Sequence, residues 1–203
     1  MPLRPRPQFP TSHGKSSSDI LTAPPAPASA AHDIFHGAWV AAVRLAFVTL
    51  QGRGRTDALI AAVAERLQMD GLRLAGTVQS NIERPDRRKC DMDLMILPQG
   101  PIVRISEDRG DLARGCTLDS GALEQSVAEV QLRLSSSDIL IVNKFGKREA
   151  EGKGLVPVIG DAVDLGIPVL VGVNGLNLAA FLAFSGEEAL ALPTALIPAN
   201  WTA

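Results

Sequence analysis

The sequence has very few aromatic residues: no tyrosine, two tryptophans and six phenylalanines among 203 residues. A core must therefore be aliphatic, and enough apolar side chains are present because hydrophobic residues make up 46% of the chain. The chain also lacks an excess of either charge, with 20 Lys and Arg against 22 Asp and Glu. This balance argues against a nucleic-acid-binding protein, and no apolar run is long enough for a membrane span.

Cysteine is scarce as well, since Cys90 and Cys116 are the only two. The first residues lack the apolar stretch of a secretory signal, so we expect a cytoplasmic protein with reduced thiols. Two thiols can hold zinc or another borderline metal, although this spacing is not that of a paired-cysteine zinc site. The alternative is that both cysteines are small core residues.

The N-terminal segment, residues 1–36, differs in composition from the rest of the chain. It is rich in proline, serine and alanine and shows no regular apolar spacing. Such a segment buries too little apolar surface to offset the entropy lost on ordering. We therefore expect a disordered tail at 1–36, followed by one folded domain at 37–203.

Within 37–203, short apolar runs alternate with segments of helical apolar spacing. Such alternation predicts an α/β three-layer domain with a mainly parallel sheet, and two runs flanking Pro98 predict a small β-hairpin excursion. The predicted strands are 43–49, 72–79, 92–97, 102–106, 138–143 and 168–173, and the predicted helices are 56–68, 119–134, 154–165 and 176–184.

A glycine-rich turn, residues 52–56 (GRGRT), lies between the first predicted strand and the first predicted helix. In a phosphate-binding loop, backbone N–H groups and the helix N-terminus face the phosphates, a lysine reaches the terminal phosphates and Ser or Thr binds magnesium. Here Gly52 and Gly54 supply the turn, Arg55 stands at the lysine position and Thr56 at the Ser/Thr position. These residues are candidates for binding a nucleotide or another anion.

This match to the phosphate-binding pattern is incomplete. The glycine that opens such a loop is replaced by Thr49. The alternative interpretation is a tight turn without a ligand, in which Thr56 or Asp57 caps the following helix.

A second candidate follows the apolar run 138–143 (DILIVN). A buried strand ending in two acids orders magnesium and activates water in nucleoside triphosphatases. Here Asn143 and Lys144 occupy those two places, and a basic loop at 144–148 that includes Lys147 follows. This loop either holds a phosphate or oxyanion or is simply a solvated surface segment. The glycine-containing run 149–154 is expected to be mobile.

Five stretches that span most of the predicted domain are distinctive: 76–81 (GTVQSN), 90–94 (CDMDL), 105–110 (ISEDRG), 115–124 (GCTLDSGALE) and 143–155 (NKFGKREAEGKGL). In these stretches and in their order, the sequence resembles the bacterial domain-of-unknown-function family 2478, which is often encoded beside molybdate-transport genes. That family is in turn similar to small P-loop nucleoside triphosphatases.

The resemblance implies a P-loop fold and ATP or GTP with magnesium as ligands. It also implies an accessory role in molybdenum or molybdoenzyme metabolism, with molybdate-transport or molybdoenzyme components as partners. Where the similar triphosphatases carry a lysine and two acids, this chain carries Arg55, Asn143 and Lys144, so we expect a degenerate member with weak or absent hydrolysis. The alternatives are an active nucleoside triphosphatase, or a protein handling a metal or molybdate through Cys90, Cys116 and nearby arginines.

Overall fold

The computed structural model describes residues 44–85, 90–107, 118–186 and 188–193. The predicted tail, residues 1–36, and the candidate metal ligand Cys116 lie outside these ranges. The predictions made for them are therefore neither confirmed nor contradicted by the fold.

The described residues form a seven-stranded sheet in the order β4-β3-β2-β5-β6-β1-β7. The neighbouring pairs β2-β5, β5-β6, β6-β1 and β1-β7 are parallel. Strand β3 instead pairs antiparallel with both β2 and β4. The mainly parallel sheet and the hairpin excursion are thus as predicted. The strands are β1 (Leu45–Val48), β2 (Leu74–Ile82), β3 (Asp91–Ile96), β4 (Ile102–Arg104), β5 (Ile139–Phe145), β6 (Val169–Val173) and β7 (Ala189–Ala191).

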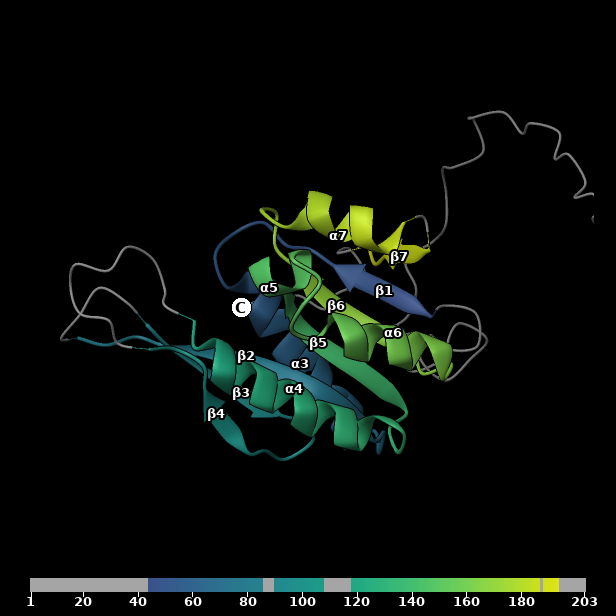
Figure 1. The fold of residues 1–203 in the computed structure, drawn as a ribbon, viewed down its shortest axis with the longest axis horizontal. Helices are drawn as coiled ribbons and strands as arrows, with labels where there is room; N and C mark the ends of the chain where they lie inside the picture. The colour runs from purple at the N-terminus through teal and green to yellow at the C-terminus, as the bar shows by residue number, and fades with distance from the viewer. Residues whose placement is uncertain (1–43, 86–89, 108–117, 187, 194–203) are drawn as a thin grey trace, which may run out of the picture.

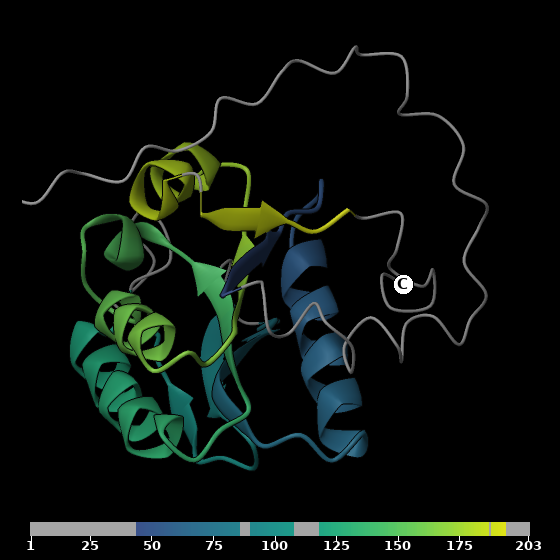
Figure 2. The same ribbon diagram turned by 90° about the vertical axis from the view of Figure 1, so that its right-hand side faces the viewer.

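Helices cover both faces of the sheet and complete three layers (Figure 1; Figure 2). Helix α3 (Arg55–Met69) lies on one face. Helices α4 (Ser120–Leu134) and α6 (Val156–Asp164) lie on the other. The short helix α5 (Lys147–Ala150) directly follows β5, and α7 (Leu178–Ser185) follows β6.

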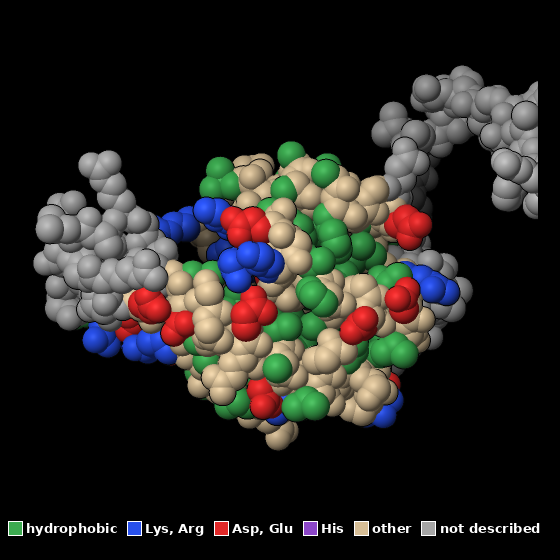
Figure 3. All heavy atoms as spheres, in the orientation of Figure 1, with side chains coloured by type: hydrophobic (Ala, Val, Ile, Leu, Met, Phe, Trp, Pro, Cys, Tyr) green, Lys and Arg blue, Asp and Glu red, His purple; other side chains and the backbone are tan. Residues whose placement is uncertain are grey.

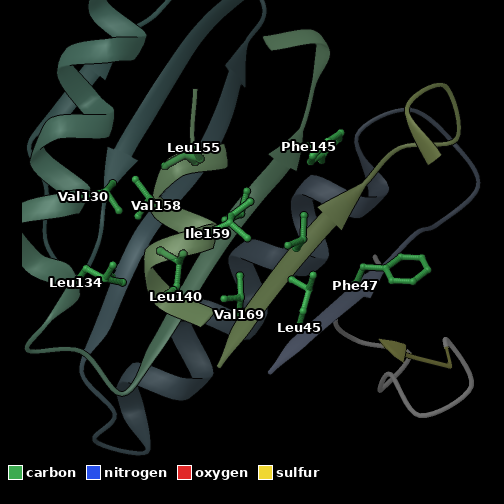
Figure 4. Close-up of a cluster of buried hydrophobic side chains, with 14 of the residues drawn as sticks. Leu45, Phe47, Val130, Leu134, Leu140, Phe145, Leu155, Val158, Ile159 and Val169 are labelled. Atoms are coloured by element: carbon green, nitrogen blue, oxygen red, sulfur yellow. The ribbon is translucent and has the colours of Figure 1, made fainter. Parts of the chain in front are cut away.

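The sheet separates the two main clusters of the core, which are largely aliphatic as the sequence composition requires, and a third, smaller cluster joins β3 to α4. Along β5, Leu140 and Val142 enter the cluster under α4 and α6, whereas Ile139 and Ile141 enter the cluster under α3. Figure 4 shows Leu140 in the first of these clusters, together with Val130 and Leu134 of α4 and Val158 and Ile159 of α6. This alternation is the two-residue period of a strand buried on both faces.

The aromatic residues that the structure describes gather at one place in the larger cluster. The ring centroid of Phe181 in α7 lies 5.0 Å from that of Phe47 in β1 and 5.2 Å from that of Phe145 at the end of β5. The ring centroid of Phe184, also in α7, lies 5.5 Å from that of Phe145. The phenylalanine cluster therefore joins the ends of two strands to the last described helix.

Two predicted boundaries are wrong for physical reasons. Strand β2 continues to Ile82, beyond the predicted end at residue 79, because its outer half pairs with β3, for example Asn81 with Met92. Strand β5 continues to Phe145, so Lys144 belongs to the strand and not to a loop. The two short elements α5 and β7 were not predicted, since a few residues carry too little periodicity to identify them.

Candidate functional site

The turn between β1 and α3 (residues 49–54, hereafter the α3 turn) depends on two glycines. Gly52 has φ of 105° and Gly54 has φ of 75°, a conformation that residues with a Cβ adopt only under strain. A Cβ on Gly52 would also lie 2.9 Å from Cδ of Arg55, so the Arg55 side chain passes over the turn. Residues 51–55 are exposed, and the arginine and the first backbone groups of α3 are accessible to a ligand.

Thr56 and Asp57 are buried in the first turn of α3, and neither caps the helix as the alternative interpretation supposed. The N-cap residue is Gly54, which makes no side-chain hydrogen bond. The hydroxyl Oγ1 of Thr56 instead accepts a hydrogen bond of 3.0 Å from the backbone N–H of Leu50. Thr56 therefore closes the α3 turn onto the helix.

The carboxylate of Asp57 joins this helix to the end of β5. Asn143 Nδ2 donates to Asp57 Oδ1 at 3.2 Å, and Lys144 Nζ donates to Asp57 Oδ2 at 3.1 Å. Asn143 is 1% exposed, whereas the Lys144 side chain is 33% exposed. The two motifs thus meet at one edge of the sheet, with the acid on the helix and the cation on the strand.

An irregularity in β5 explains how two successive side chains reach the same carboxylate. The pairing of β5 with β6 advances three residues on β5, from Val142 to Phe145, but two on β6. A bulge of this kind turns a side chain that would otherwise point to the opposite face. Gly172 of β6 permits it, since a Cβ there would lie 2.2 Å from the backbone oxygen of Asn143.

The segment after β5 (residues 146–155, hereafter the α5 segment) is held by a buried acid. Glu149 accepts hydrogen bonds from the backbone N–H groups of Gly146, at 3.0 Å, and Leu155, at 3.2 Å. Burial raises the pKa of the Glu149 carboxyl, and these hydrogen bonds together with the nearby Arg148 oppose the rise. The segment expected to be a mobile loop is therefore a short helix and turn closed around Glu149.

The surface of the α5 segment carries paired charges of both signs (Figure 3). The Lys147 side chain is 89% exposed, and its Nζ lies 3.8 Å from Glu151 Oε1. Arg148 Nη2 lies 3.2 Å from Glu124 Oε1. The structure does not bring Lys147 into the Asp57 contact. Its assignment to the binding site stays a prediction.

A third strand end reaches this edge from β6. Asn177 Nδ2 donates to the backbone oxygen of Phe145 at 3.1 Å, and the Asn177 backbone N–H donates to Asn174 Oδ1 at 3.0 Å. Sequence reasoning missed both asparagines. The signal was available, because Asn174 directly follows the apolar run of β6, and ligands bind beyond the carboxyl ends of such strands.

A magnesium ion is implied by the fold, but the residues at this edge do not fit one. The side-chain oxygens that could bind a metal ion here are Thr56 Oγ1, the Asp57 carboxylate and Asn143 Oδ1. Of these, Asn143 Oδ1 is buried without a hydrogen-bond partner. The Lys144 ammonium already lies on the Asp57 carboxylate. Two unit charges 4 Å apart interact by about 4 kcal/mol at an effective dielectric constant near 20, and a divalent ion doubles that repulsion.

The thiol site can be tested only in part. Cys90 is a free, half-buried cysteine immediately before β3. Among the described residues, no group of three or more His, Cys, Asp and Glu side chains is placed to hold a metal ion. A site shared by Cys90 and Cys116 stays a prediction.

The described helices are all too short or too polar to cross a bilayer. The parallel sheet, its flanking helices and the glycine turn before α3 define an α/β domain of the P-loop nucleoside-triphosphatase type. The structure is similar to the solution structure of a human cancer-related nucleoside triphosphatase, with a TM-score of 0.53 and 17% sequence identity. The match covers 74% of this chain and 88% of that one, and at this identity it shows the fold alone.

The chain belongs to the family described as "Protein of unknown function (DUF2478)", whose model matches residues 45–198. It is also 33% identical over 144 residues to the molybdenum import ATP-binding protein ModC 2 of Bradyrhizobium diazoefficiens. That match covers 70% of this chain but 16% of the relative, so the chain spans about a sixth of its length. The predicted family and fold are confirmed.

Proposed function

We propose that this protein binds a nucleotide or another oxyanion at the carboxyl edge of its sheet and hydrolyses it slowly or not at all. The observation that carries the proposal is the contact of Asn143 and Lys144 with Asp57. It brings the end of β5 against the first turn of α3. Ligands of open α/β sheets bind at this edge, and helix N-termini favour anions.

The binding residues we assign are Gly52, Gly54, Arg55 and Thr56 in and after the α3 turn, and Asn143, Lys144 and Lys147 in and after β5. The two glycines let the backbone approach the ligand closely, and Arg55 supplies an exposed positive charge. The Lys144 ammonium adds charge-assisted hydrogen bonding, which is roughly twice as strong as hydrogen bonding between neutral groups.

Slow turnover is expected from the chemistry of the same residues. Hydrolysis requires a group that orients and deprotonates the attacking water. Asn143 carries no negative charge, and Lys144 cannot accept a proton while it is charged. The nearby carboxylates already accept hydrogen bonds within the protein. Asp57 accepts from the Asn143 amide and the Lys144 ammonium, and Glu149 accepts from two backbone N–H groups.

An accessory role in molybdenum metabolism extends this proposal. It is supported by the similarity to a molybdenum import ATP-binding protein, of which this chain matches a small part. On this view the protein acts in the cytoplasm, and its partners are molybdate-transport or molybdoenzyme components. Molybdate is then a candidate ligand alongside ATP and GTP.

A thermal-shift screen of ATP, GTP, phosphate, molybdate, tungstate and zinc tests the binding proposal directly. A ligand that binds only the folded state raises the melting temperature by mass action. Arg55→Ala should abolish the shift, whereas Arg133→Ala, a change on α4, should leave it intact. If none of these ligands shifts the melting temperature, the proposal is wrong.

Phosphate release from ATP and GTP tests the proposed lack of turnover. A working enzyme typically turns over about once per second or faster. Turnover at that rate, lost in Thr56→Ala, would show that the protein is an active nucleoside triphosphatase instead.

A further inference from the structure

Lys144 is bound to the carboxylate that a divalent cation would otherwise use at this edge. Its Nζ lies 3.1 Å from Asp57 Oδ2, and the second carboxylate oxygen accepts from Asn143 at 3.2 Å. Both Asp57 oxygens therefore already receive a donor, one of which is a full positive charge. A magnesium ion at this carboxylate would lie close to the Lys144 ammonium, and the repulsion between the two positive charges would oppose its binding.

The position of Lys144 follows from the backbone. The bulge in β5 directs Asn143 and Lys144 to the same carboxylate, and the absence of a side chain on Gly172 leaves room for it. Because Asn143 is buried among core elements, its amide cannot turn away without disturbing the core. The backbone at Asn143 and Lys144 is thus fixed by the sheet, and the Lys144 side chain extends from this fixed position to Asp57.

The ammonium can still reach a ligand. An ammonium has three N–H groups, and the hydrogen bond to Asp57 uses one of them. A third of the Lys144 side chain is exposed, at the edge where Arg55 and the α3 turn are also exposed. Lys144 can therefore bridge the buried carboxylate and an anion, which is the electrostatic role that a metal ion has in related folds.

We infer that Lys144 replaces the divalent cation, so that this site binds its phosphate-type or other oxyanion ligand without a metal. The inference rests on the proposed function and adds the charge state of the ligand. A free anion is the form that is bound. A nucleotide already complexed with magnesium would bring a second cation beside Lys144 and bind more weakly.

The test is calorimetric titration of the full chain with ATP, inorganic pyrophosphate and molybdate, each in EDTA and in excess magnesium chloride. Binding in EDTA should be at least as tight as with magnesium, and ATP should bind more weakly when magnesium is in excess. This comparison uses the wild-type protein, so it does not depend on the folding of any variant.

Variants then assign the effect to Lys144. Lys144→Met should weaken binding in EDTA by about tenfold or more, the loss expected for a charge-assisted hydrogen bond. Lys144→Arg, which keeps the charge, should restore most of it. Lys153→Met removes an exposed lysine of the α5 segment and should leave binding unchanged.

The metal itself provides a readout that needs no ligand. Asn143→Asp combined with Lys144→Ala restores an acid and removes the ammonium, so this variant should bind Mn²⁺ in electron paramagnetic resonance titrations where the wild type does not. Wild-type binding that requires magnesium would overturn the inference while leaving the proposed function in place. Equal binding by Lys144→Met and wild type would also overturn it, and no binding under either condition would overturn both proposals.

Discussion

The α3 turn and the α5 segment meet at the same edge of the sheet, yet they are built in opposite ways. The α3 turn has exposed residues, two glycines with positive φ and one closing hydrogen bond from Leu50 to Thr56. The α5 segment closes around the buried Glu149, and its surface residues Lys147, Arg148 and Glu151 form ion pairs.

The difference separates two tasks. A binding loop needs backbone N–H groups that are free to meet a ligand, and such loops are drawn from the less stable parts of a fold. The α5 segment instead fixes the end of β5, and with it Asn143 and Lys144. One region is therefore expected to respond to ligand, and the other to determine stability.

The largest effect on stability is expected from Glu149→Ala. It leaves the backbone N–H groups of Gly146 and Leu155 without their acceptor, at about 2–4 kcal/mol in the free energy of unfolding. Chemical denaturation measures this loss. The control Glu151→Ala removes an exposed carboxylate from the same segment and should cost less than about 1 kcal/mol. Equal losses would show that Glu149 does not hold the segment.

Lys144 connects the two regions, and its removal should have an intermediate effect. Lys144→Met leaves the buried carboxylate of Asp57 without its cation, which should cost about 1–3 kcal/mol, below the value for a fully buried pair because Lys144 is partly exposed. Adding Asp57→Asn should recover part of this loss. A double-mutant cycle of chemical denaturation measures the coupling, and additive losses would contradict the pairing.

Substitution of one glycine in each region compares the two directly. Gly52→Ala and Gly152→Ala both place a Cβ at positive φ, and each should cost about 1 kcal/mol. Only Gly52→Ala also meets the side chain of Arg55, so it alone should weaken anion binding in a thermal-shift titration. Weakened binding in Gly152→Ala would show that the backbone conformation of the α5 segment, and not only its Lys147, affects binding.

The smallest effect is a pH dependence. Burial raises the pKa of Glu149 above its ordinary value of 4.5, so the folded protein holds this proton more tightly than the unfolded chain. Its contribution to stability is therefore full below 4.5 and falls as the pH rises through the folded value. The stability of wild type relative to Glu149→Gln should decrease over that window in denaturation measured at several pH values. Glu151→Gln should retain the wild-type pH dependence.

Much of the fold was predictable because its strands are continuous apolar runs. The run 138–143 indicated the core of β5, and the helix predicted at 119–134 agrees with α4 to within one residue. In the structure, Asp119 is the N-cap of this helix. The outer half of β2 was not predictable, since its pairing with β3 depends on residues distant in the sequence. Local pattern carries no information about such partners.

The position of the candidate site was predictable, but the contacts between its side chains were not. Two polar residues at the end of an apolar strand indicated Asn143 and Lys144, yet their common partner Asp57 was considered only as a helix cap. The bulge that directs them is a tertiary feature. Its one sequence signal was Gly172 inside an apolar strand, which often marks a bulge or a close backbone approach.

The phenylalanine cluster has a practical consequence for all of these measurements. Phe47, Phe145 and Phe181 lie together in the core, the chain has no tyrosine, and its two tryptophans, Trp39 and Trp201, lie outside the described residues. Tryptophan emission therefore comes from outside the described part of the fold, whereas the near-ultraviolet circular dichroism of phenylalanine comes largely from its packed core. The phenylalanine signal therefore offers a direct report on the packing of β1, β5 and α7 around the ring of Phe181.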